Sequence, residues 1–274
     1  MQRERTAKAF RIPGVLLTLL ILFIVLQGFS QGDCQSRATH EGKPIPELKV
    51  EWEEVLTNET IKMNGLTWDG ENFWVITYQS SPIAWQIAKL DGLGKVVFAF
   101  SVPCKSRDDI HNSGFTNLAW DGEFIWANNW NEGKIYCYST SGYFVKSFEI
   151  PSLGQLIPVG IAWDGDNLWI LHWSTKTVYE VDRDGQKTGR ALSLASFKPS
   201  LDAGLAWDGS CFWVGSKGSN LAVRVSPSGE AMAFVRGPRT SGSVRDLTYD
   251  NKYLYWIYQQ GHTIYRAKIS DNSP

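Results

Sequence analysis

The sequence is short of the residues that most metal and nucleophilic sites require. It contains 4 Cys and 4 His among 274 residues. The cysteines form no CxxC pair, and the histidines have no spacing typical of metal ligands. No HExxH zinc motif and no glycine-rich phosphate loop occurs. The sequence therefore predicts no metal and no cofactor.

Excess charge of either sign is also lacking. The chain has 27 Lys and Arg against 28 Asp and Glu, a formal net charge of -1. This balance argues against a nucleic-acid partner. What the chain has instead is 13 Trp, 10 Tyr, 13 Phe and 25 Gly, with only 20% charged residues. Such a composition excludes a disordered chain and a helical bundle.

The first 30 residues have the pattern of a targeting segment. Arg3, Arg5, Lys8 and Arg11 precede an apolar run over residues 15–26, in which Thr18 is the one polar residue. A basic flank followed by a short apolar run is typical of a secretory signal peptide, with cleavage expected near residue 31. The alternative is an uncleaved membrane anchor over residues 10–29. Both predict an extracytoplasmic protein, either secreted or periplasmic, and contact with a membrane only through this segment. Residues 31–46 are expected to be a polar linker.

Five repeats fill most of the remaining chain. They read GLTWDGENFWVI, NLAWDGEFIWAN, GIAWDGDNLWIL, GLAWDGSCFWVG and DLTYDNKYLYWI. Their leading aromatics, at positions 68, 120, 163, 207 and 249, lie 52, 43, 44 and 42 residues apart. A period in the low forties with short strands is typical of a four-stranded propeller blade.

The first repeat predicts the pairing of one hairpin. Asp and Gly favour a turn over residues 69–72. Pairing Trp68 with Phe73 then places Thr67 opposite Trp74, and the same register holds for the other repeats. The small-against-large pairs expected from it are Ala119–Trp126, Ala162–Trp169, Ala206–Trp213 and Thr248–Tyr255. The motif aromatics are therefore expected in the core.

The last repeat ends one strand short, after Ile269. A strand at the other end, LKVEWEEV over residues 48–55, has no hairpin of its own. We expect this strand to complete the last blade and close the ring. The predicted fold is an all-β, five-bladed β-propeller over residues 47–270, followed by a tail at 271–274. The alternative, a six-bladed ring, would need about 40 more residues.

Candidate site residues follow from the repeat frame. Loops at the mouth of a propeller funnel carry function because the blades hold them rigidly. Positions three or four before each leading aromatic, and nine or ten after it, diverge most between repeats. The ligand-binding candidates at or near these positions are Asn64, Tyr78, Asn117, Asn128, Trp130, His172, Trp173, Lys217, Arg245 and Tyr258.

The run IWANNWNEGKIYCYSTSGYFVKSF resembles a stretch of the plant and bacterial glutamine cyclotransferases, which are five-bladed propellers. The resemblance implies a fold over residues 47–270 and places Asn128 and Trp130 at the funnel. It also implies cyclisation of an amino-terminal glutamine with release of ammonia, using a carboxylate acid/base and no metal. The family's FTEGL motif corresponds to Met63–Leu66, where Asn64 stands in place of Glu. Asparagine cannot transfer the proton. The last repeat, YLYWIYQQGHTIYRAKI, is also similar to YWTD propeller blades, which bind proteins.

Two functions follow as hypotheses. The first is a propeller that binds a peptide or small molecule, or another protein, at its central funnel. The second is a glutaminyl-peptide cyclotransferase in which another carboxylate has replaced the missing Glu. Its candidates are Asp202, two residues before Gly204, and Asp246, directly before Leu247. A carboxylate near the same cavity is required because the acid/base must lie within hydrogen-bond reach of the reacting amine.

Overall fold

The computed structural model describes residues 37–80, 83–103, 114–150, 157–259 and 261–269. All of these belong to one unit, Arg37–Pro274. The described residues form strands, turns and loops, and among them there is no helix that could span a membrane. The all-β prediction is confirmed.

Most strands belong to five four-stranded antiparallel sheets, named blades 1 to 5 in chain order. Blade 1 contains β4 (Met63–Trp68), β5 (Phe73–Ser80), β6 (Ile83–Leu90) and β7 (Val96–Ser101). Blade 2 contains β8 (Phe115–Trp120), β9 (Phe124–Asn129), β10 (Lys134–Ser139) and β11 (Phe144–Glu149). Blade 3 contains β12 (Pro158–Trp163), β13 (Leu168–His172), β14 (Thr177–Val181) and β15 (Lys187–Ser193). Blade 4 contains β17 (Ala203–Trp207), β18 (Phe212–Ser216), β19 (Leu221–Val225) and β20 (Ala231–Arg236). Blade 5 contains β21 (Val244–Tyr249), β22 (Tyr253–Tyr258), β23 (Thr263–Lys268) and β3 (Trp52–Thr57).

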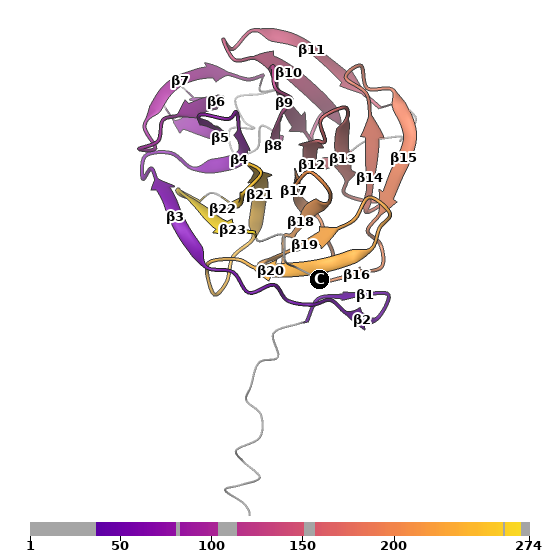
Figure 1. Ribbon diagram of the computed structural model, residues 1–274. Coiled ribbons are helices and arrows are strands. Elements are labelled where there is room, and N and C mark those ends of the chain that lie inside the picture. Colours follow the sequence, from indigo (N-terminus) through magenta and orange to yellow (C-terminus); the bar gives the residue numbers. More distant parts are fainter. Residues whose placement is uncertain (1–36, 81–82, 104–113, 151–156, 260, 270–274) are drawn as a thin grey trace, which may run out of the picture. The chain divides into compact units, whose positions relative to one another are not determined.

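The first strand of each repeat lies innermost, so that β4, β8, β12, β17 and β21 surround a common centre (Figure 1). Each of these strands contacts the innermost strands of the two neighbouring blades, and β21 contacts β4. The sheets therefore form a closed ring, the arrangement of a β-propeller.

An early strand of the chain completes the last blade, as predicted. β3 pairs antiparallel with β23, with Thr57 opposite Thr263 and Trp52 opposite Ala267. The strand spans residues 52–57, a few residues later than the predicted 48–55. Residues 46–48 run beside blade 4 instead, where the Leu48 amide donates to the Phe234 carbonyl at 2.8 Å.

The segment expected to be a polar linker differs from that expectation over residues 37–46. There, β1 (Thr39–His40) and β2 (Lys43–Pro44) form a three-stranded sheet with β16 (Phe197–Lys198). Ala38 and Ile45 are buried in the core of blades 3 and 4. Burial of these two apolar side chains stabilises the packing of this otherwise polar segment against the blades.

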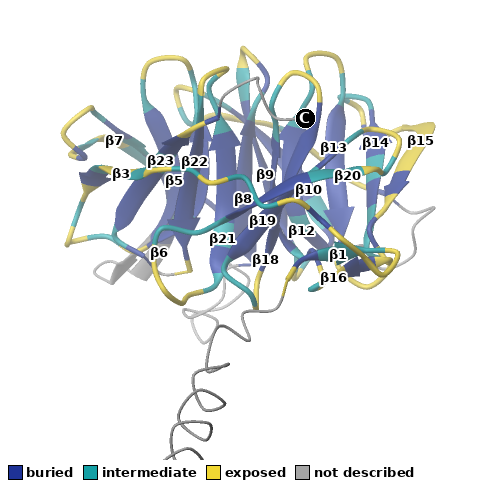
Figure 2. Cartoon of the chain, turned by 60° about the horizontal axis from the view of Figure 1, so that its bottom comes forward, coloured by how far each residue is buried: buried dark blue, intermediate teal, exposed yellow. Residues whose placement is uncertain are grey.

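The predicted hairpin register is confirmed in all repeats. Thr67 lies opposite Trp74, and the four later small-against-large pairs occur as expected. The large member of each pair is buried between blades, whereas the leading aromatic of each motif is only half-buried. Figure 2 shows that buried residues lie along the strands and exposed residues mostly in the turns. The core prediction therefore holds for Trp74 and its equivalents but only in part for Trp68 and its equivalents.

The aspartate of each motif joins the turn to the core. Its Oδ1 accepts hydrogen bonds from the backbone N–H groups two and three residues later. Its Oδ2 accepts a hydrogen bond from the side chain of the buried aromatic residue of the same hairpin. The side-chain distances are 2.7 Å for Asp69–Trp74, 2.8 Å for Asp121–Trp126, 2.7 Å for Asp164–Trp169, 3.0 Å for Asp208–Trp213 and 2.7 Å for Asp250–Tyr255. The motif thus satisfies the indole N–H of four buried tryptophans and the hydroxyl of Tyr255.

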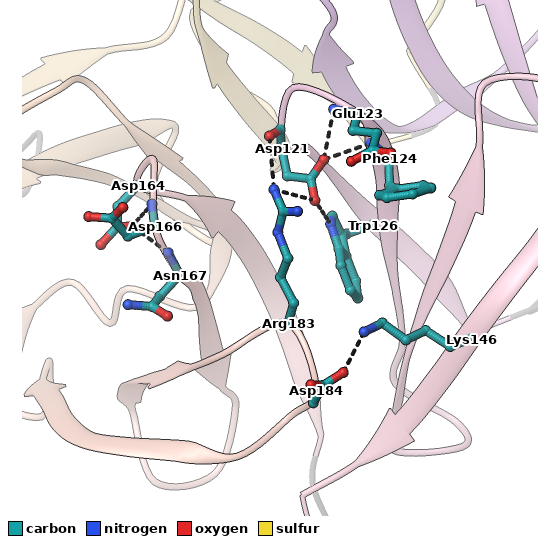
Figure 3. Close-up of polar contacts among 10 residues, drawn as sticks. All are labelled: Asp121, Glu123, Phe124, Trp126, Lys146, Asp164, Asp166, Asn167, Arg183 and Asp184. Atoms are coloured by element: carbon teal, nitrogen blue, oxygen red, sulfur yellow. Dashed lines mark hydrogen bonds and ion pairs between the residues drawn. The ribbon is translucent and has the colours of Figure 1, made fainter.

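Blades 2 and 3 are linked through one of these aspartates (Figure 3). The Arg183 guanidinium lies 3.3 Å from Asp121 and stacks 4.8 Å from the Trp163 ring. Lys146 and Asp184 form a second link at 2.6 Å. In blade 4 the cation beside the motif aspartate is Arg224 of the same sheet. These pairs help to fix the orientation of the blades around the centre.

Candidate functional site

A cavity of about 620 Å³ lies where the innermost strands begin. We call it the funnel cavity. Its lining combines aromatic, charged and amide side chains from all five blades. They are Asn64, Trp85, Thr116, Asn117, Trp130, Ile157, Val159, Trp173, Asp202, Ala203, Lys217, Val244, Arg245 and Gln259. A second space of about 70 Å³ lies at the other end of the same strands, lined in part by the leading aromatics.

Irregularities in the innermost strands direct side chains into the funnel cavity. Pairing shifts register between Met63 and Gly65, and at the corresponding point of each other innermost strand. Residues displaced by these shifts include Asn64, Val159 and Arg245, all of which line the cavity. A bulge re-aims a side chain without interrupting the rest of the strand. The divergence of the repeats at these positions therefore coincides with access to the cavity.

Three tryptophans supply the aromatic part of the lining. Trp85 belongs to β6, whereas Trp130 and Trp173 directly follow β9 and β13. The backbone fixes the latter two, since the Trp130 amide donates to the Gly114 carbonyl and the Trp173 amide to the Ile157 carbonyl, both at 2.9 Å. Trp173 is 48% exposed, too much for a residue that belongs to the core. Lys176 Nζ lies 5.2 Å from the centroid of the Trp173 ring, and the remaining exposed part of the ring can contact a ligand.

The charged groups of the lining are Asp202, Lys217 and Arg245. Asp202 Oδ2 lies 3.2 Å from Lys176 Nζ, and Asp202 Oδ1 accepts the Lys217 backbone N–H at 3.1 Å. Arg245 Nε donates to the Asn64 carbonyl at 3.0 Å. Burial lowers the pKa of Arg245 to about 10. The guanidinium therefore remains positively charged at neutral pH.

Asp246 is fully buried behind this lining, at the centre of the ring. Its Oδ2 accepts the backbone N–H groups of Leu66 at 2.9 Å and Leu118 at 3.2 Å, and its Oδ1 accepts that of Leu247 at 2.9 Å. The Asn117 side chain is a further hydrogen-bond partner. Burial raises the pKa of Asp246 to about 7 against the opposing effect of these hydrogen bonds. The carboxylate joins blades 5, 1 and 2.

The structure brings most of the predicted site residues together. Those that line the funnel cavity are Asn64, Asn117, Trp130, Trp173, Asp202, Lys217 and Arg245. The Tyr78 side chain lies outside the described part of the structure. Asp246 lies behind the lining rather than in it.

Three other predicted residues belong to the framework. Asn128 is fully buried, and its amide donates to the Pro158 carbonyl at 2.6 Å. His172 is buried, with its ring 6.4 Å from that of Tyr179. The Tyr258 hydroxyl bonds Asn220 at 2.8 Å. None of the three lines the funnel cavity, and the polar groups of Asn128 and Tyr258 bond to neighbouring residues instead.

Sequence reasoning missed Trp85, because its blade position is a third strand rather than a loop. A signal was present in the 52-residue spacing of the first two repeats. Part of the extra length lies in this hairpin, where β5 and β6 have 8 residues each, against 5 or 6 in the second and third strands of blades 2 to 5. The longer hairpin carries Trp85 to the cavity.

The two cysteines of the described ranges offer little reactivity. Cys137 and Cys211 are buried free thiols, and burial raises the pKa of both, that of Cys137 to about 12. In the described ranges no group of three or more His, Cys, Asp or Glu side chains is placed to hold a metal ion.

Comparison with known proteins adds a fold and no more. No family model and no curated protein matches the sequence. The glutaminyl cyclase of Myxococcus xanthus has a similar structure, with a TM-score of 0.63 at 11% identity over 84% of this chain and 100% of that one. The nidogen/laminin complex contains a chain with a TM-score of 0.49 at 18% identity, covering 72% of each chain. The structure of virginiamycin B lyase of Staphylococcus aureus has a TM-score of 0.44 at 19% identity, over 82% of this chain and 76% of that one.

The predicted resemblance to the glutamine cyclotransferases is therefore confirmed for the fold. At 11% identity the similarity to the Myxococcus enzyme does not carry its activity to this chain. The two weaker similarities carry no argument.

Proposed function

We propose that this chain binds a small ligand, or one end of a peptide, in the funnel cavity. The observation that supports this most is the lining itself: three indoles and several amides and charges converge on about 620 Å³. That volume falls within the roughly 300–1,000 Å³ typical of small-molecule sites. Aromatic walls would bury the apolar part of a ligand, and the polar groups would fix its orientation.

A pair of substitutions tests this proposal. Trp130→Ala and Trp173→Ala together should weaken binding of peptide or aromatic probes by at least about tenfold, because an aromatic contact adds about 0.5–1.5 kcal/mol beyond burial at each site. Isothermal titration calorimetry with a dipeptide panel measures this. Tyr143→Ala is the matched control, since Tyr143 is 74% exposed and does not line the cavity. Unchanged affinity in the double variant would overturn the proposal, and a large fall in its thermal transition would assign both residues to the core.

A second candidate is a glutaminyl-peptide cyclotransferase activity based on Asp202. It is supported by the placement of Asp202, the one carboxylate among the described lining residues of the funnel cavity. Such a carboxylate would accept a proton from the attacking α-amine and return one to the leaving ammonia. Asp246 is less suited, because its oxygens already accept the backbone N–H groups of three strands.

Ammonia release from Gln-Ala peptide, measured over a range of pH, tests this second candidate. Release that disappears in Asp202→Asn would support it, whereas no release by the unmodified chain at high concentration would end it.

We also propose an extracytoplasmic location, based on the basic and apolar pattern of residues 1–30. These residues lie outside the described part of the structure. Amino-terminal sequencing of the mature protein tests the proposal. A start near Gln31 is expected for a secreted or periplasmic protein, and an intact Met1 in the membrane fraction for an anchor at residues 10–29.

A further inference from the structure

The charges in the funnel cavity are not balanced. The carboxylate of Asp202 already has a cation beside it, Lys176 at 3.2 Å. The other charged lining residues are Lys217 and Arg245, and within the described ranges neither forms an ion pair. Among the described lining residues, the funnel cavity therefore presents two cations without an ion-pair partner, Lys217 and Arg245, and no carboxylate without one.

Asp246 does not neutralise its neighbour Arg245 by direct contact. Its two oxygens accept the backbone N–H groups of Leu66, Leu118 and Leu247. No ion pair joins it to the guanidinium in the described part of the chain. Because Asp246 lies behind the lining and Arg245 lies in it, a ligand would meet the cation and not the anion.

The Arg245 side chain is held in place by one hydrogen bond, and its other N–H groups are available to a ligand. Its Nε donates to the Asn64 carbonyl at 3.0 Å. The two Nη atoms have no hydrogen-bond acceptor among the described residues. A guanidinium presents its remaining N–H groups as a planar fork that matches the two oxygens of a carboxylate. The backbone contact thus orients a fork that has no partner among the described residues and is open to a ligand.

We infer that the ligand of the funnel cavity carries a carboxylate, which binds Arg245 and leaves the apolar part of the ligand beside Trp130 and Trp173. This inference rests on the proposed function and narrows it to one chemical class. Lys217 is exposed and would strengthen the attraction from the rim. A carboxylate suits the site better than a phosphate, because Arg245 is the only one of the two unpaired lining cations that is partly buried, whereas Lys217 is exposed and solvent screens its charge.

Matched probes test the inference on the full chain. N-acetyl-phenylalanine ends in a carboxylate. N-acetyl-phenylalaninamide replaces that carboxylate with a neutral carboxamide of similar size. Phenyl phosphate supplies a doubly charged alternative. Isothermal titration calorimetry should show the carboxylate binding about tenfold or more tightly than the amide, since a hydrogen bond to a charged group contributes about 1.5–3 kcal/mol. Raising the ionic strength should weaken binding of the carboxylate more than that of the amide.

Substitutions locate the effect. Arg245→Gln should reduce the affinity for the carboxylate to that for the amide, and Lys217→Gln should reduce it by a smaller factor. Lys95→Gln is the control, because it removes one charge from an exposed turn between β6 and β7 outside the cavity. If Arg245→Gln does not fold, the affinity of Lys217→Gln and the salt dependence of binding to the unmodified chain still show whether the carboxylate binds the cations of the cavity.

Each outcome separates the two proposals. Equal binding of carboxylate and amide, lost in the Trp130→Ala and Trp173→Ala variant, would leave the proposed function standing and overturn the inference. Tighter binding of phenyl phosphate would overturn the choice of carboxylate. Failure of every probe to bind would count against both.

Discussion

Replacing Asp208 by Asn tests the role of the motif aspartates. Asp208 Oδ1 accepts the amides of Ser210 and Cys211 and the Ser210 hydroxyl, at 2.8–3.0 Å. Its Oδ2 accepts the Trp213 indole N–H at 3.0 Å and Arg224 Nε at 2.6 Å. In Asp208→Asn the first oxygen remains. The second becomes an NH₂ group that faces two donors, so both of its bonds are lost.

The cost follows from these two bonds. The indole contact is a bond from a neutral donor to a charged acceptor, and the Arg224 contact is a largely buried ion pair with side chains 20% and 2% exposed. Removing one partner of a buried ion pair costs about 3–5 kcal/mol. We expect Asp208→Asn to lower the free energy of unfolding by about 3–4 kcal/mol at pH 7.

The effect should depend on pH in a defined direction. Burial alone would raise the pKa of Asp208, but hydrogen bonds from Arg224 and Cys211 lower it below its usual 3.8. The carboxylate therefore contributes stability above pH 4, and this contribution is lost as the pH falls through the folded-state pKa. The difference between the unmodified chain and Asp208→Asn should narrow below about pH 4.

Urea unfolding at pH 7 and pH 3 measures both expectations. Asp182→Asn is the matched control, because Asp182 Oδ1 also accepts two turn amides, at 2.8 and 2.9 Å, with no indole or cation beside it. This variant should stay within about 0.5 kcal/mol of the unmodified chain. If Asp208→Asn costs no more than Asp182→Asn, or if its cost is the same at both pH values, the assigned role of the motif is wrong.

Three further predictions concern the centre and the closure of the ring. Gly204→Ala should cost about 2 kcal/mol or more in urea unfolding, because its φ is +30° and a Cβ would lie 2.8 Å from Asp246 Cα; Gly92→Ala, with open space around it, should be nearly neutral. The Asp246 carboxyl should titrate near pH 7 in ¹³C NMR. Because its pKa is raised in the folded state, its contribution to the free energy of unfolding should fall as the pH rises from about 4 to 7. Titration of this carboxyl below pH 5 would contradict the prediction. Deleting residues 1–36 should leave a soluble protein with a cooperative thermal transition, whereas deleting residues 1–57 should give aggregates in size-exclusion chromatography, since it removes β1, β2 and β3.

The strand register could be predicted from sequence because a slip of one residue would move every aromatic to the wrong face. Thr67 opposite Trp74 leaves one arrangement in which a small residue fits a large one, and the structure has it. The packing of residues 37–46 could not be predicted in the same way. Two buried side chains, Ala38 and Ile45, hold that segment, and two apolar residues in a polar stretch give no periodic signal.

For the site, the repeat frame predicted which positions face the centre but not how far each side chain reaches. Asn64 and Arg245 reach the funnel cavity because the strand bulges beside them. Asn128 lies on β9 opposite the irregular part of β8, and its amide bonds inward to the Pro158 carbonyl. A bulge depends on the backbone of both paired strands, so the pattern of residues along either strand does not predict it. The charge imbalance also needed the structure, because only it shows Lys176 beside Asp202.

The pairing of β3 with β23 has a consequence for biosynthesis. Thr57 and Thr263, whose hydroxyls lie 2.9 Å apart, are separated by 206 residues of chain. A ribosome adds about 5–20 residues per second, so β3 waits roughly 10–40 s for its partner to be made. During that time its backbone edge and Trp52 have no blade to join, and they are open to chaperones, to an export machinery or to other nascent chains. The ring can close only after the last blade has been translated.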